Sequence, residues 1–315
     1  MIALRDAVEE YLTIRRALGS KIPTAAAPLR RFATFLECEG ADFVTTKLAL
    51  CWAQQSVHAQ PATWADRLGV VRRFAAWRCI TDPRTEIPPP GLLPHRRRRK
   101  PPYIYSDNEI KRLVAQAAQL SSPSGLRGST FATLFGLLAA TGLRLGEALA
   151  LDMSDVNLLE GIVNVRKAKF GKSRFVPLHD STRQVLARYA GIRDRIIGRR
   201  ATDAFFVTER GTRIRHAMAE WTFAKVSCAI GLREPAPRGC TGRGPRLHDL
   251  RHRFAAARIV AWYRAGLDVE RELPKLATYL GHVHVRHSYW YIEAVRELLQ
   301  LATERFAGQP RQEAR

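Results

Sequence analysis

The sequence has few cysteines, and their spacing forms no pair. Its 315 residues contain five, which are Cys38, Cys51, Cys79, Cys228 and Cys240, and none of them belongs to a Cys-x-x-Cys motif. An odd, dispersed set excludes a disulfide framework and a zinc module built on cysteine pairs. It is typical of reduced thiols, so we expect a cytosolic protein.

Long apolar runs are also missing. The longest nearly apolar stretch covers residues 131–143, and Gly136, Thr141 and Gly142 interrupt it. This stretch is too short to cross a bilayer, and no basic segment followed by an apolar one opens the chain. We therefore predict neither a membrane-spanning segment nor a secretory signal.

Acidic residues are scarce relative to basic ones. The chain has 29 Asp and Glu against 51 Lys and Arg, which leaves a net charge of +22. Because 46% of the residues are hydrophobic and 9% are aromatic, the chain is not a disordered basic tail. A folded chain of this length is expected to form roughly two domains. Its positive charge makes nucleic acid the first partner to consider.

The charge is densest in residues 92–104, which contain five basic and no acidic side chains. The mutual repulsion of these charges and the flanking prolines oppose a helix. We therefore predict a basic interdomain linker at 92–104 between domains at 1–91 and 105–315. The linker is either a solvated hinge or a contact to a DNA phosphate backbone. Its basic residues are Arg96, Arg97, Arg98, Arg99 and Lys100.

Residues 1–91 show helical periodicity. Apolar residues recur at spacings of three and four in the segments 4–12, 29–36 and 64–77. We expect an all-helical domain whose periodic aromatic residues form the core. Arg72 and Arg73 lie on its last helix, where they form either a solvated face or a contact to DNA.

The second half mixes helices with a β-hairpin. Ser106 and Glu109 have the spacing of a capping box that opens a helix, and a second apolar helix is expected to end near Ala140. Residues 162–165 and 175–178 read as two strands. Helical periodicity returns after the hairpin. The prediction is a mainly α fold with a small β-sheet, of the α+β class.

Four clusters in this half carry side chains suited to phosphodiester chemistry. Arginine forks hold the nonbridging oxygens of a phosphate, a lysine protonates a leaving oxygen, and a tyrosine attacks phosphorus. Each cluster alone has an ordinary structural explanation, and only their combination indicates this chemistry. The candidates are Arg144, Lys169, His248, Arg251, His282 and Tyr291.

These clusters resemble the motifs of the tyrosine recombinases, the integrases of the phage and Xer type. The family's A-T-G-x-R-x-x-E box is matched by residues 140–147, and its lysine before a V-P-L strand is matched by Lys169. Residues 248–251 match H-x-x-R, and 280–282 match L-G-H with a tyrosine nine residues beyond the histidine. The resemblance covers roughly residues 105–305.

The resemblance implies strand exchange through a covalent intermediate. Tyr291 would attack the scissile phosphate and form a 3′-phosphotyrosyl link. Lys169 would protonate the leaving 5′-oxygen. His248 would accept the tyrosine proton or orient the phenol.

The resemblance also implies roles for the residues around the phosphate. Arg144 and Arg251 would clamp it, and His282 would assist by hydrogen bonding. Glu147 either orients Arg144 or is a helix N-terminal acid favoured by the dipole. By the same resemblance, neither metal nor ATP is needed, and no cofactor is expected.

The implied architecture is a C-shaped clamp around DNA. A helical core-binding domain (1–91) and a catalytic domain (105–315) would form it. Double-stranded recombination sites, four protomers on a Holliday junction and accessory recombination proteins are the implied partners. The implied setting is a mobile element or chromosome in the bacterial cytoplasm, associated with the nucleoid. An apolar helix at 295–306 would pack on its own domain or on a neighbouring protomer.

Several alternatives stay open. Tyr289 rivals Tyr291 as the nucleophile, and Lys167 and Lys172 rival Lys169. Lys172 and Arg174 are expected to contact the DNA backbone.

Other functions also stay open. A zinc site on His282, His284 and His287 is disfavoured. The alternative functions are DNA relaxation of the type IB topoisomerase kind and DNA binding without catalysis.

Overall fold

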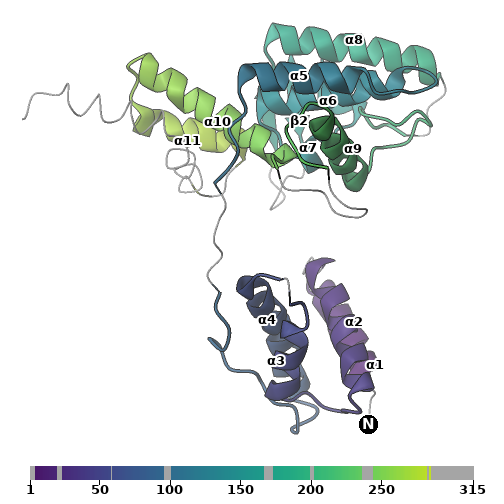
Figure 1. The fold of residues 1–315 in the computed structure, drawn as a ribbon, viewed down its shortest axis with the longest axis vertical. Coiled ribbons are helices and arrows are strands. Elements are labelled where there is room, and N and C mark those ends of the chain that lie inside the picture. Colours follow the sequence, from purple (N-terminus) through teal and green to yellow (C-terminus); the bar gives the residue numbers. More distant parts are fainter. Residues whose placement is uncertain are drawn as a thin grey trace, which may run out of the picture. The chain divides into compact units, whose positions relative to one another are not determined.

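A computed structural model describes residues 4–19, 23–57, 59–95, 101–166, 173–198, 202–235, 244–281 and 284. The chain forms two compact units, residues 1–100 and 101–315, and the boundary between them lies within the segment 92–104. Figure 1 shows the elements of each unit.

The N-terminal unit is helical throughout its described part. It consists of α1 (Leu4–Ala17), α2 (Pro23–Cys38), α3 (Thr46–Gln54) and α4 (Pro61–Arg78). The periodic aromatic residues form its core, as predicted: Phe32 and Phe74 are fully buried, and the Tyr11 ring meets the Phe74 ring edge-on. Arg72 donates to the carbonyls of Pro88 and Pro89 at 2.6 and 2.8 Å, whereas Arg73 is exposed.

The described part of the C-terminal unit is mainly helical. Its helices are α5 (Asp107–Ala118), α6 (Leu126–Thr141), α7 (Leu145–Ala150), α8 (Asp180–Ile197), α9 (His216–Ala229), α10 (Leu247–Arg264) and α11 (Val269–Leu280). Helix α6 is buried along most of its length because α5, α8 and α10 all pack against it. The helix that begins the unit is held by the predicted capping box, in which the Ser106 hydroxyl accepts from the Glu109 amide.

The small sheet comprises β1 (Val156–Asn157), β2 (Ile162–Val165) and β3 (Arg174–Pro177), in that order and antiparallel. A short 3₁₀ turn, η1 (Met153–Asp155), precedes it. The predicted hairpin is confirmed, with its second strand beginning one residue earlier than expected. Strand β1 was not predicted because two residues show no alternation. Together with the helices, the sheet confirms the α+β class.

No helix in the described ranges is long and apolar enough to cross a membrane.

Candidate active site

A left-handed glycine turn places Arg144 at the start of a helix. Helix α6 ends at Gly142, whose φ is 63°, and Arg144 is the N-cap of α7. A Cβ on Gly142 would lie 2.7 Å from the Phe254 ring. The first motif therefore needs glycine both for its backbone angle and for its close packing.

A second glycine ends α11. The φ of Gly281 is 67°, and a Cβ there would lie 2.8 Å from Nη1 of Arg174. The chain leaves the helix here, one residue before His282. The glycine of the L-G-H motif thus serves the same two purposes as Gly142.

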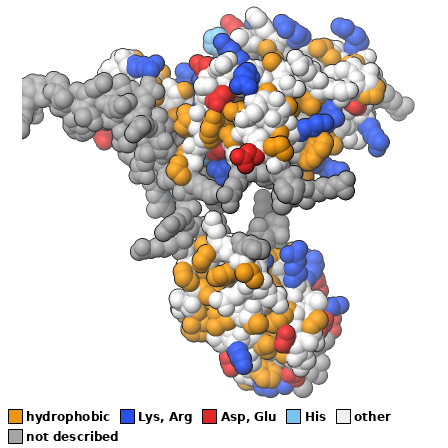
Figure 2. Space-filling model, in the orientation of Figure 1, with side chains coloured by type: hydrophobic (Ala, Val, Ile, Leu, Met, Phe, Trp, Pro, Cys, Tyr) orange, Lys and Arg blue, Asp and Glu red, His pale blue; other side chains and the backbone are white. Residues whose placement is uncertain are grey.

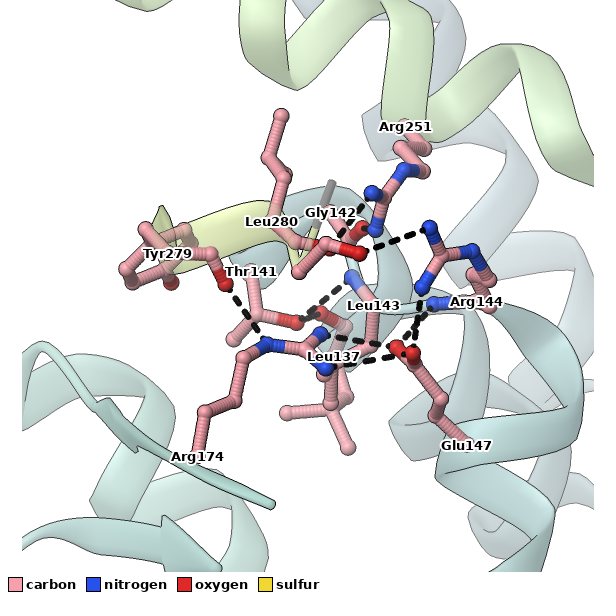
Figure 3. A network of polar contacts seen from close by, with 11 residues as sticks. Leu137, Thr141, Gly142, Leu143, Arg144, Glu147, Arg174, Arg251, Tyr279 and Leu280 are labelled. Carbon is pink, nitrogen blue, oxygen red and sulfur yellow. Dashed lines mark hydrogen bonds and ion pairs between the residues drawn. The ribbon is translucent and has the colours of Figure 1, made fainter. Parts of the chain in front are cut away.

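Arg251 joins these two helix ends. Its side chain projects from α10 and is 2% exposed. Nη1 donates to the Gly142 carbonyl at 2.7 Å and Nη2 to the Leu280 carbonyl at 2.6 Å (Figure 3). A buried guanidinium with two backbone acceptors is held rigidly, so Arg251 fixes the distance between the two motifs.

Three arginines hold three consecutive carbonyls at the end of α11. Arg174 donates to Tyr279, Arg251 to Leu280 and Arg144 to Gly281, at 2.7, 2.6 and 3.2 Å. The last carbonyls of a helix have no partner within it and carry its negative dipole end. The guanidinium groups donate hydrogen bonds to these carbonyls and place positive charge at the negative end of the helix dipole. Figure 3 shows the three arginines converging on the end of α11.

The Glu147 carboxylate lies between two of these arginines. It accepts from Arg144 Nη1 at 2.6 Å and from Arg174 at 3.1 and 2.8 Å. Burial alone would raise the pKa of Glu147, but the Arg174 hydrogen bonds, the Arg144 amide and both guanidinium charges lower it to about 2. Glu147 is therefore ionised at neutral pH, which agrees with both predicted roles, orienting Arg144 and placing an acid at a helix N-terminus.

His248 lies in the first turn of α10, close to the arginines. Although the residue is exposed, desolvation of its ring and then the charge of Arg251 lower its pKa below the ordinary value. His252 meets its ring edge-on, with centroids 4.9 Å apart. The lowered pKa favours the neutral imidazole of His248, which is the form that can accept a proton.

The structure brings together four of the predicted catalytic and supporting residues. Arg144, Glu147, His248 and Arg251 lie around the ends of α6 and α11 and the beginning of α10. The other predicted catalytic residues and most predicted DNA contacts lie outside the described residues. These are Lys169, His282, Tyr291, Arg96, Arg97, Arg98, Arg99, Lys100 and Lys172, together with the rivals Lys167 and Tyr289.

The environment of Arg174 was not predicted from the sequence. It was expected to contact the DNA backbone, and its side chain is 11% exposed beside Glu147. The alternation of β3 carried the missed signal, because Arg174 shares a strand face with the buried Val176. The DNA contact stays a prediction.

The described part of the chain contains no cluster of three or more His, Cys, Asp or Glu side chains that could hold a metal ion. Its four described cysteines, Cys38, Cys51, Cys79 and Cys228, are free thiols.

Comparison with known proteins gives one consistent family. The model of the phage integrase family matches residues 104–297. Over 310 residues the chain is 45% identical to the Sinorhizobium fredii protein y4rB, which is named as an integrase/recombinase, and the alignment covers 97% of each protein. It is 28% identical over 242 residues to tyrosine recombinase XerD of Neisseria meningitidis, covering 76% of this chain and 75% of that protein.

Solved structures agree in fold. The integrase of transposon Tn1549, bound to transposon right end DNA, superimposes with a TM-score of 0.64 at 15% identity. The match covers 96% of this chain and 99% of that one. At this identity the likeness shows the fold.

Proposed function

The chain belongs to the phage integrase family, and from this premise we propose that it is a site-specific tyrosine recombinase that cleaves and rejoins DNA. The observation that carries the proposal is the meeting of Arg144 and Arg251 at one helix end, with His248 one helical turn before Arg251 on α10. Two forked cations next to a proton acceptor suit a phosphodiester whose charge rises in the transition state.

The proposed reaction exchanges one phosphoester bond for another. The Tyr291 oxygen forms a bond to phosphorus, its proton passes to His248, and the bond to the 5′-oxygen breaks. Lys169 supplies the proton that the leaving oxygen takes up. The phosphotyrosyl link conserves the bond energy, and a 5′-hydroxyl of the partner strand reverses the steps.

Arg144 and Arg251 have different exposures, which supports different tasks. The Arg144 side chain is 28% exposed, so it has a solvent-facing side on which an oxyanion can bind. Arg251 is almost fully buried and engaged by two carbonyls. We assign the more adaptable phosphate contact to Arg144 and the fixed contact to Arg251, with His282 as a hydrogen-bond donor.

The assembly follows from the chemistry. Exchange of two strand pairs requires four nucleophiles, so we propose a tetramer on a Holliday junction, built on double-stranded recombination sites. Residues 1–91 would bind the core site and 105–315 would catalyse, joined by the linker 92–104. The visible face of each unit carries basic side chains (Figure 2), in keeping with a DNA partner.

The cellular setting is also a proposal. We propose that the protein acts in the bacterial cytoplasm, at the nucleoid, on a mobile element, with accessory recombination proteins. The similarity to y4rB, which is named as an integrase/recombinase, supports a role in DNA integration.

Covalent capture tests the proposed function. Purified protein is incubated with a sheared library of DNA from its source genome, and fragments that stay attached after denaturation are sequenced. We expect attachment at a defined site for the unaltered protein and none for Tyr291→Phe, which should still bind the recovered duplex.

Three outcomes would contradict parts of this assignment. Attachment by Tyr291→Phe together with its loss in Tyr289→Phe would move the nucleophile. Relaxation of supercoiled DNA that contains one site, without any two-site product, would indicate a topoisomerase. Site binding without attachment would leave a DNA-binding protein.

A further inference from the structure

Arg174 occupies the point where the hairpin meets the site. It is the first residue of β3, pairs with Val165 of β2, and follows the segment 167–172 after one intervening residue. The other arm of the hairpin ends at Arg166, which forms ion pairs with Asp152 and Asp155. Each arm is thus tied to the body of the unit by an arginine.

The guanidinium of Arg174 is committed to the protein by three bonds. Nε donates to the Tyr279 carbonyl at 2.7 Å, Nη1 to Glu147 Oε1 at 3.1 Å and Nη2 to Glu147 Oε2 at 2.8 Å. The two bonds to Glu147 form a parallel fork, the geometry that fixes a carboxylate in one plane. Its side chain is 11% exposed, and each of its three guanidinium nitrogens donates to a protein acceptor.

Through these bonds Arg174 contacts the groups that hold Arg144 and Arg251 in place. Glu147 also holds the side chain and the amide of Arg144, at 2.6 and 3.0 Å. Tyr279 directly precedes Leu280, whose carbonyl accepts from Arg251. Arg174 therefore connects the hairpin to α7 through a carboxylate and to the end of α11 through a carbonyl.

Charge balance gives Arg174 a second task. With Arg144 alone, an ionised Glu147 would form a neutral pair and weaken the stabilisation that Arg144 gives to the charge that builds on the phosphate during cleavage. With two arginines sharing one carboxylate, the group keeps a net positive charge. Arg174 in this way leaves the charge of Arg144 available for the transition state while Glu147 holds its orientation.

We propose that Arg174 is a positioning residue for strand cleavage, which acts through Glu147 and the Tyr279 carbonyl and makes no contact with DNA. The inference rests on the proposed recombinase function. In this proposal an internal contact takes the place of the predicted phosphate contact. Loss of the side chain would lower the cleavage rate in the first case and weaken DNA binding in the second.

The test compares Arg174→Met and Arg174→Lys with a matched control, Arg193→Met. Arg193 is also buried, and it donates to the Asp194 carboxylate and to the Phe205 carbonyl at 2.8 Å each, in α8 and its neighbouring loop. Loss of either arginine removes a guanidinium with a carboxylate and a carbonyl partner. Of these two arginines, only Arg174 is hydrogen bonded to residues of the candidate active site.

Two measurements use the duplex recovered by covalent capture. The single-turnover rate of covalent attachment is measured at saturating DNA, and the binding constant is measured over a range of salt. For Arg174→Met we expect the rate to fall up to roughly 100-fold, the loss associated with a misplacement of about 1 Å. Its binding constant and salt slope should match those of the unaltered protein. Arg174→Lys keeps the charge but not the fork, so its rate should be intermediate.

A phosphate contact would give the opposite pattern. Its loss would reduce the magnitude of the slope of log K against log salt by about 0.9, with weaker binding. That result, or an equal fall in rate for Arg193→Met, would overturn the proposal. A full rate in Arg174→Met would overturn it as well.

Hydrogen exchange distinguishes failure of the positioning role of Arg174 from failure of the proposed recombinase function. Without DNA, Arg174→Met should speed amide exchange in residues 144–151 and 274–281, and Arg193→Met should not. If the unaltered protein attaches to no DNA, the recombinase assignment fails while the exchange data still test the positional role. Unchanged exchange in both segments would overturn that role.

Discussion

Replacing Gly281 by alanine separates backbone strain from displacement of Arg174. A left-handed backbone costs a non-glycine residue about 1–2 kcal/mol, and φ at Gly281 is 67°. The added Cβ would also lie 2.8 Å from Arg174 Nη1. Because a guanidinium is the end of a flexible side chain, it shifts away from the Cβ more cheaply than a packed ring or the backbone would, while its bonds to Glu147 and Tyr279 loosen. We expect a loss of about 1–2 kcal/mol, or roughly 2–8 °C in Tm for a unit of this size.

A matched glycine gives the control. Gly266 follows α10 with a φ of 70°, and a Cβ there would meet nothing within 4 Å. Gly266→Ala should lower Tm by a similar amount and leave strand cleavage unchanged. Gly281→Ala should slow cleavage up to roughly 100-fold because it moves Arg174.

Asparagine tests the two effects independently. Asn tolerates the left-handed region better than alanine does but still carries a Cβ. Gly281→Asn should therefore recover part of the Tm and none of the cleavage rate. If Gly281→Ala cleaved DNA at the unaltered rate while its Tm fell with that of Gly266→Ala, the link between this glycine, Arg174 and cleavage would be refuted.

Three further predictions follow from the site. Gly142→Ala should lose more stability in urea unfolding than Gly281→Ala, by about 1–3 kcal/mol, because its Cβ would meet the packed Phe254 ring at 2.7 Å; equal losses would contradict this. Cleavage should persist below pH 6.5 and fall only at lower pH, because desolvation first and then Arg251 lower the pKa of His248; a midpoint above 6.5 in the pH–rate profile would argue against His248 as the base. Stability should decrease as pH falls from 6.5 through 4, because burial and then His248 lower the pKa of His252 to about 4 and the unfolded chain binds the proton more readily; His252→Gln should flatten that dependence in thermal melts.

Local patterns explain what the sequence could predict. The capping box of Ser106 and Glu109 acts within one turn, and the alternation of 162–165 and 174–177 fixes a hairpin by neighbours on the chain. Both were predictable because their causes are close in sequence. The motif glycines were recognised by resemblance, and their physical reason became clear only with the Cβ contacts to Phe254 and Arg174.

The contacts of the site could not be predicted in the same way. Arg174 and Glu147 are separated by 27 residues, and Arg174 and Tyr279 by 105. A strand face shows that Arg174 turns inward, but not which carboxylate it meets. The convergence of three arginines on three consecutive carbonyls depends on the packing of α6, α10 and α11, which no local signal encodes.

The three held carbonyls have a consequence for engineering. Arg144, Arg174 and Arg251 reach the end of α11 from three different segments. Their bonds to it are accepted by the carbonyls of residues 279–281, so no acceptor lies beyond residue 281 among these bonds. Gly281 is therefore a natural junction for chimaeras, at which the chain beyond the helix can be exchanged with that of a relative. Such an exchange would import a new segment at the position of the proposed nucleophile, while the anchoring of the arginines stayed that of the parent.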